Sequence, residues 1–155
     1  GLFRDAVRRE AADFPGLAID EVLVDTMALR LIRDPESFDV VVTTNLFGDI
    51  LTDEAAMLVG GLGLAPAGNI GDRIAIFEPV HGSAPDIAGQ GIANPSAAML
   101  SAGMLLDYLG QAEAGARVRT AVFAALQAGH LTPDLGGTST TAEVGDFILN
   151  QITNG

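Results

Sequence analysis

Apolar residues recur at helical spacing in several stretches of the chain and form short β-branched runs in others. The spacing predicts helices over residues 2–14, 26–33, 46–59, 95–109, 112–128 and 141–152. The β-branched runs predict strands over residues 17–24, 38–43 and 73–78. A strand is followed by a helix twice before residue 60, and this alternation indicates an α/β fold.

Three stretches between these elements are rich in Gly and Pro and show no regular period. Residues 60–71 predict a long loop or a crossing between domains. Residues 78–95 contain three prolines and three glycines, which exclude regular structure over that length. Residues 132–137 form a third irregular segment. Ordered loops of this length usually bind something, so the segment 78–95 is the first candidate for a functional site.

Two carboxylates, Asp49 and Asp53, lie four residues apart in the helix predicted after Asn45, which we expect to cap it. Stacked one turn apart, they repel each other, and a divalent cation would offset that repulsion. A solvated acidic helix face is the alternative. Asp25 follows the strand predicted over residues 17–24, where it could bind a ligand or cap the next helix. Three carboxylates without cysteine favour a hard ion, Mg²⁺ or Mn²⁺.

The segment His81-Gly82-Ser83 offers an imidazole, a hydroxyl and backbone N–H groups, which together could hold a phosphate or an adenine ring. Asp86 could accept hydrogen bonds from ribose hydroxyls. A structural histidine and a turn-capping aspartate are the alternatives. The sequence lacks G-x-G-x-x-G after its first strand and G-x-x-x-x-G-K, so neither common nucleotide fingerprint is present.

Composition removes several classes of function. Twenty acidic residues face eight basic ones, a formal net charge of −12, so the chain offers no basic face for nucleic acid. There is no cysteine and no lysine, which excludes disulfides, thiolate chemistry and Schiff bases within the chain. No apolar run is long enough to cross a bilayer, so we expect no membrane partner. The missing cysteine fits a cytoplasmic protein.

Five segments together resemble one enzyme family. They occur in order over residues 45–53, 60–66, 78–89, 91–95 and 134–137. They resemble the β-decarboxylating dehydrogenases that act on 3-isopropylmalate, homoisocitrate and isocitrate. The resemblance covers essentially the whole chain and corresponds to the C-terminal half of such an enzyme. It implies an isopropylmalate-dehydrogenase-like α/β fold, distinct from the classical Rossmann fold and incomplete without the N-terminal half.

The resemblance also implies roles for individual residues. Asp49 and Asp53 match metal ligands of one subunit, and Asp25 matches a ligand that reaches the same Mg²⁺ or Mn²⁺ from the partner subunit of a homodimer or higher homo-oligomer. Other positions match the adenosine side of an NAD site: Glu78, His81, Gly82, Ser83, Ala84, Asp86, Asn94 and Asp134. An acid at position 86 favours NAD because it would repel the 2′-phosphate of NADP.

The implied reaction is oxidation and decarboxylation of a 3-substituted malate, a small hydroxy-polycarboxylate. The lysine and tyrosine that transfer protons in the family belong to its N-terminal half, so we expect no catalytic residue in this chain and no activity from it alone. Residues 1–60 are expected in the dimer-forming, metal-binding domain and residues 61–155 in the cofactor-binding domain. A non-catalytic subunit or interaction module of the same fold, or a free-standing Mg²⁺-binding domain, are the alternatives.

Overall fold

The computed structural model describes residues 1–154 and divides them into two compact units. The first unit is Gly1–Ala55 and the second begins at Ala56. The helix α3 (Asn45–Leu58) starts in the first unit and ends in the second.

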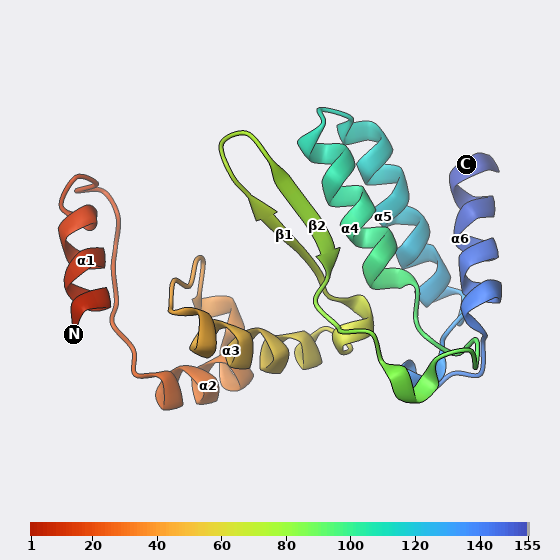
Figure 1. Ribbon diagram of the computed structural model, residues 1–155, viewed down its shortest axis with the longest axis horizontal. Helices are drawn as coiled ribbons and strands as arrows, with labels where there is room; N and C mark the ends of the chain where they lie inside the picture. Colours follow the sequence, from red (N-terminus) through yellow and green to blue (C-terminus); the bar gives the residue numbers. More distant parts are fainter. Residues whose placement is uncertain (155) are drawn as a thin grey trace. The chain divides into compact units, whose positions relative to one another are not determined.

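The first unit consists of helices joined by extended chain (Figure 1). It contains α1 (Leu2–Ala11), α2 (Val24–Arg33), the short 3₁₀ helix Pro35–Ser37 and most of α3. The predicted helices are confirmed, although α1 ends before the expected Phe14 and α2 begins two residues earlier than expected. Proline starts the 3₁₀ turn that follows α2, as its fixed φ allows.

Among the described residues 1–154 the chain forms no strand over residues 17–24 or 38–43, so these two strand predictions are wrong. Residues 17–23 and 40–44 have no regular structure, and neither segment pairs with a strand. Val40 and Val42, in the second of these segments, are 85% and 63% exposed. The β-branched pattern reports a preference for extended chain, but a strand also needs a neighbour for its N–H and C=O groups.

The second unit starts with an antiparallel hairpin of β1 (Pro66–Ile70) and β2 (Ala75–Pro79). The strand β2 confirms the strand predicted over residues 73–78, shifted by about two residues. The strand β1 was missed, because it lies inside the segment 60–71 that we expected to be a loop. Its sequence, PAGNI, has low β propensity, so pairing with β2 and not local preference makes it a strand.

Three helices follow the hairpin: α4 (Ser96–Tyr108), α5 (Ala112–Gln127) and α6 (Thr141–Asn154). All three confirm the sequence prediction. Helix α4 packs against both the hairpin and α5, and α5 also packs against α6 (Figure 1). Apolar side chains of α5 and α6 form the buried core of this unit, namely Ala121, Val122, Ala125, Val144 and Ile148.

Small residues let α4 and α5 approach closely. A Cβ added to Gly115 would lie 2.8 Å from the carbonyl oxygen of Gly103, so no larger residue fits at that crossing. One turn away along each helix, Arg119 donates two hydrogen bonds to the carboxylate of Asp107. The side chains of this ion pair are about two-thirds buried. The pair therefore adds a directional, charge-assisted contact between two helices that are already packed together.

The start of α6 is fixed by a reciprocal pair of hydrogen bonds between Thr140 and Glu143. The backbone N–H of Thr140 donates to the Glu143 carboxylate over 2.8 Å, and the backbone N–H of Glu143 donates to the Thr140 hydroxyl over 3.2 Å. This is a capping box. The hydrogen bonds from Thr140 lower the pKa of the Glu143 carboxyl below its ordinary value of 4.5.

No helix among the described residues 1–154 is long and apolar enough to cross a membrane.

Candidate functional site

The second unit contains a cavity of about 1000 Å³ beside the long loop that joins β2 to α4. Four segments contribute to its wall: the 3₁₀ turn after α3, the β2–α4 loop, the segment before α6 and the first residue of α6. The lining residues are Leu62, Gly63, His81, Gly82, Ser83, Ala84, Ile87, Ala88, Gly89, Gly91, Ile92, Ala93, Asn94, Pro133, Asp134 and Thr141. A cavity of this size accepts a large organic ligand.

The β2–α4 loop forms one wall, and its first residues are held by local contacts. His81 Nδ1 lies 2.9 Å from the carbonyl oxygen of Gly82, so the tautomer that carries its proton on Nδ1 donates to that oxygen. Ala84 has φ = 44°, the left-handed region, and no other non-glycine residue in the described chain has a positive φ. Such a conformation costs energy for alanine and is concentrated at functional sites.

Asn94, near the end of this loop, and Asp134 meet at the wall of the cavity although forty positions separate them. Asn94 Nδ2 donates to Asp134 Oδ2 over 3.1 Å, and the backbone N–H of Ser96 donates to Asn94 Oδ1 over 3.0 Å. The hydroxyl of Thr132 donates to the other carboxylate oxygen, Oδ1 of Asp134. These bonds place a carboxamide and a carboxylate side by side at the cavity.

Gly63, in the 3₁₀ turn Leu62–Leu64, lies directly against this pair. A Cβ on Gly63 would be 2.5 Å from Asp134 Oδ2 and 3.0 Å from both Cβ and Nδ2 of Asn94. The position therefore has to be glycine for the three segments to approach this closely.

Thr141 closes the same wall from the start of α6. Its backbone N–H donates to the carbonyl oxygen of Gly91 over 2.8 Å, and its hydroxyl donates to the carbonyl oxygen of Ala93. The loop before α4 is thus tied to α6 by two hydrogen bonds. Its backbone cannot move away from the cavity without breaking them.

Six of the eight predicted cofactor contacts line the cavity, and two do not. Those that line it are His81, Gly82, Ser83, Ala84, Asn94 and Asp134. Glu78 and Asp86 are exposed and do not line the cavity. Asp86 lies in the 3₁₀ turn Pro85–Ile87, between the lining residues Ala84 and Ile87, so it stands next to the wall. Glu78 alternates with Phe77 and Pro79 along β2 and faces away from the more buried side.

The sequence reasoning missed three residues that shape this cavity: Gly63, Thr132 and Thr141. Gly63 belongs to a glycine-rich segment that was too generic to single out. Thr132 is the first residue of the irregular segment 132–137 and Thr141 is the first residue of the last helix, and at such positions a threonine resembles an ordinary capping residue. Only the contact between distant segments distinguishes them.

The carboxylates predicted as metal ligands lie in the first unit. Asp49 and Asp53 are one turn apart on α3, both exposed, and Asn45 Nδ2 donates to Asp49 Oδ2 over 2.9 Å. The expected capping role of Asn45 is therefore corrected, because Asn45 is the first residue of α3 and its amide holds a carboxylate. Asp25 is likewise the second residue of α2 and not its cap, and its Oδ1 accepts from the backbone N–H of Thr26.

Asp25, Asp49 and Asp53 do not gather at one point within a single chain. Residues 1–154 contain no group of three or more His, Asp or Glu side chains placed to hold a metal ion. The donor set still suits a hard divalent cation, since every candidate is a carboxylate oxygen.

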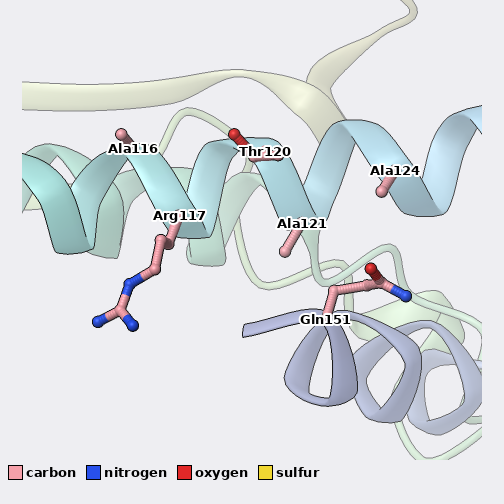
Figure 2. Close-up of a pocket in the computed structure, with 6 residues that line it drawn as sticks. All are labelled: Ala116, Arg117, Thr120, Ala121, Ala124 and Gln151. Carbon is pink, nitrogen blue, oxygen red and sulfur yellow. The ribbon is translucent and has the colours of Figure 1, made fainter. Parts of the chain in front are cut away.

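A second, smaller hollow of about 310 Å³ lies between α5 and α6. Figure 2 shows Ala121 on α5 pointing toward α6, which carries Gln151. The lining consists of Ala116, Arg117, Thr120, Ala121, Ala124 and Gln151. It holds no carboxylate, imidazole or other proton-transfer group, so this hollow has no evident catalytic chemistry.

The sequence and fold place the chain in a known family. Residues 1–148 match the isocitrate/isopropylmalate dehydrogenase family, and the chain belongs to it. The crystal structure of isocitrate dehydrogenase from Methylococcus capsulatus matches with a TM-score of 0.93 at 44% identity, over 98% of this chain and 46% of that one. This match confirms the expected isopropylmalate-dehydrogenase-like α/β fold and its incompleteness relative to the family.

Individual relatives carry several dehydrogenase names. The isocitrate/homoisocitrate dehydrogenase of Thermus thermophilus is 64% identical over 152 residues, 98% of this chain and 46% of the relative. The 3-isopropylmalate dehydrogenase of Archaeoglobus fulgidus is 53% identical, over 98% of this chain and 47% of the relative. A β-decarboxylating dehydrogenase from Thermococcus kodakarensis in its apo form has a TM-score of 0.83 at 47% identity, over 99% of this chain and 45% of that one. The chain spans slightly less than half the length of these relatives.

Proposed function

We propose that the chain supplies the cofactor-binding wall and the metal-binding carboxylates of an NAD-dependent dehydrogenase that oxidises and decarboxylates a 3-substituted malate. The observation that carries this proposal is the cavity of about 1000 Å³ in a chain of the isocitrate/isopropylmalate dehydrogenase family. The Asn94–Asp134 pair and the His81–Ala84 segment both line this cavity and give it polar contacts for a dinucleotide.

The adenosine half of NAD would occupy the cavity. The lining residues proposed to contact it are His81, Gly82, Ser83, Ala84, Asn94 and Asp134. Asp86 would accept hydrogen bonds from the ribose hydroxyls, and its negative charge would oppose the 2′-phosphate of NADP. Glu78, exposed on β2, is proposed as a further contact.

Asp49 and Asp53 would bind Mg²⁺ or Mn²⁺ from one subunit and Asp25 of a partner copy would reach the same ion, so a homodimer or higher homo-oligomer completes the site. Their anionic oxygens fit this role, because Mg²⁺ and Mn²⁺ prefer oxygen ligands. When bound, the ion supplies Lewis-acid polarisation of the substrate oxygens. The chain's own contribution is to hold the two α3 carboxylates one turn apart, with Asn45 orienting Asp49.

The lysine that transfers protons in the family has no counterpart in this chain, so that role would fall to another part of the enzyme. We therefore propose that residues 1–60 act in a dimer-forming, metal-binding domain and residues 61–155 in a cofactor-binding domain of a longer cytoplasmic enzyme. The exposed valines of residues 40–42 support this, since extended apolar chain is stabilised by neighbouring strands. Relatives named for isocitrate, homoisocitrate and 3-isopropylmalate define the substrate class rather than one substrate.

The test compares the 155-residue chain with the complete enzyme in an assay of NADH formation. Each reaction contains Mn²⁺, NAD⁺ and one of isocitrate, homoisocitrate or 3-isopropylmalate. The complete enzyme is expected to reduce NAD⁺ with at least one acid, and the isolated chain is not. No turnover by the complete enzyme with any of the three acids, or enzyme-like turnover by the isolated chain, would contradict the proposal.

A further inference from the structure

Thr132, which bonds to Asp134 behind the wall of the cavity, belongs to the interior of the unit. Its side chain is 1% exposed, whereas Asp134 is exposed and Asn94 is half-buried. Its carbonyl oxygen accepts the backbone N–H groups of Leu135 and Gly137 over 3.0 and 3.1 Å. Packing and hydrogen bonding therefore hold Thr132 in place independently of any ligand.

The hydroxyl of Thr132 donates to Asp134 Oδ1, which leaves Oδ2 for Asn94. An ionised carboxylate only accepts hydrogen bonds, so the group of Asn94 that faces Asp134 has to be its NH₂. A backbone N–H only donates, so the group of Asn94 that faces Ser96 has to be its oxygen. Both neighbours thus demand the same orientation of the Asn94 carboxamide.

These two bonds use one N–H of the carboxamide and one lone pair of its oxygen. Among residues 1–154 the second N–H of the Asn94 side chain has no hydrogen-bond acceptor, and Asn94 lines the cavity. The carboxamide can therefore present a donor of fixed direction to a ligand.

We propose that Thr132 is a positioning residue of the cofactor site: its buried hydroxyl fixes Asp134, and Asp134 fixes the carboxamide of Asn94 that receives the adenine. This inference rests on the proposed NAD-binding function. Thr132 itself does not line the cavity, so it acts through the other two residues.

If Thr132 had only a structural role, its side-chain volume would matter and its hydroxyl would not. Filling the interior requires the volume and the methyl group of threonine, which valine also supplies. The hydroxyl, however, is directed at the exposed Asp134, which lines the cavity. Removing only the hydroxyl should therefore disturb cofactor binding more than it disturbs the core.

The experiment measures NAD⁺ affinity by calorimetry, and KM and kcat by NADH formation, in the complete enzyme. Thr132→Val is expected to raise the Kd and the KM for NAD⁺ by about three- to tenfold. This is less than the full effect of losing a hydrogen bond to a charged group, because Thr132 does not contact the cofactor itself. The kcat at saturating NAD⁺ and the KM for the acid substrate should stay unchanged. Thr132→Ser, which keeps the hydroxyl, should restore NAD⁺ affinity. Thr153→Val, which removes an exposed hydroxyl bonded within α6, is the matched control and should have no effect.

A double-mutant cycle tests the route through Asn94. If Thr132 acts through that carboxamide, Thr132→Val should add little to the loss caused by Asn94→Ala. If Thr132→Val does not fold, Thr132→Ser and Thr132→Ala replace it, because both lose the methyl group and differ only in the hydroxyl.

Two results would overturn the inference. One is a lower Tm of Thr132→Val with unchanged NAD⁺ affinity, and the other is full additivity with Asn94→Ala. Failure of the unsubstituted complete enzyme to bind NAD⁺ would instead overturn the proposed function itself. The two failures are therefore distinguishable.

Discussion

Gly63 lies so close to Asp134 that no side chain fits between them. A Cβ on Gly63 would be 2.5 Å from Asp134 Oδ2, the same oxygen that accepts the hydrogen bond of Asn94. A segment that follows α3 is thereby packed against the wall of the cavity. Through this contact Gly63, which the Gly-rich sequence of residues 60–71 did not single out, becomes part of the site.

Gly63→Ala is expected to weaken NAD⁺ binding by about tenfold, because the new methyl group displaces Asp134 and Asn94 from their hydrogen bond. The measurement is the Kd for NAD⁺ by calorimetry in the complete enzyme. Gly16→Ala is the control, since a Cβ there has no heavy atom within 4 Å. An unchanged Kd for Gly63→Ala would show that the site tolerates displacement of the pair.

Gly115→Ala should destabilise the second unit by about 1–3 kcal/mol, because the added Cβ would lie 2.3 Å from Oδ1 of Asp107 and 2.8 Å from the backbone oxygen of Gly103. Gly145→Ala, inside α6, is the matched control. Its Cβ would make an ordinary 3.7 Å contact with Met99, so the higher helix propensity of alanine should raise stability slightly. Thermal unfolding of the two variants is the measurement, and equal Tm values would refute the close-packing explanation.

Glu143 should titrate below 4.5 because Thr140 donates hydrogen bonds to its carboxylate. A depressed pKa means that the capping box contributes stability above pH 4.5, and that this contribution is lost as the pH falls through the lowered pKa of the folded state. An NMR titration of the side-chain carboxyl carbon measures the shift directly. Thr140→Ala should move the pKa part of the way back, and a pKa at or above 4.5 in the unsubstituted protein would contradict the assignment.

Asp49→Ala and Asp53→Ala should each weaken Mn²⁺ binding to the complete enzyme by at least tenfold, because each removes a charged oxygen ligand. Calorimetric titration with Mn²⁺ measures the effect. The control is Glu54→Gln, which alters a neighbouring carboxylate on α3 that is not a proposed ligand. The Mn²⁺ affinity of this variant should match that of the unsubstituted enzyme. If all three variants bind Mn²⁺ equally well, the α3 carboxylates are a solvated face and not a metal site.

Asp86→Lys should shift cofactor preference toward NADP⁺ by more than tenfold. The substitution removes a ribose acceptor and places a cation beside the position of a 2′-phosphate. The readout is the ratio of kcat/KM for the two cofactors. An unchanged ratio would mean that Asp86, which stands next to the cavity but does not line it, is not the residue that reads the ribose.

Local periodicity alone located the helices. The apolar spacing of α5 and α6 is sufficient because a helix satisfies its own backbone hydrogen bonds within one segment. The five ordered segments between residues 45 and 137 were together sufficient to point to the family, which the comparison confirms.

Strands and contacts depended on tertiary structure. Residues 38–43 have strand composition but no paired neighbour, whereas Pro66–Ile70 has loop composition and becomes a strand because β2 pairs with it. The same reason applies to the site: Gly63, Asn94 and Asp134 are far apart in sequence, and no local pattern reports their meeting. Backbone pairing and close approach between distant segments are properties of the folded chain, so only the tertiary structure decided them.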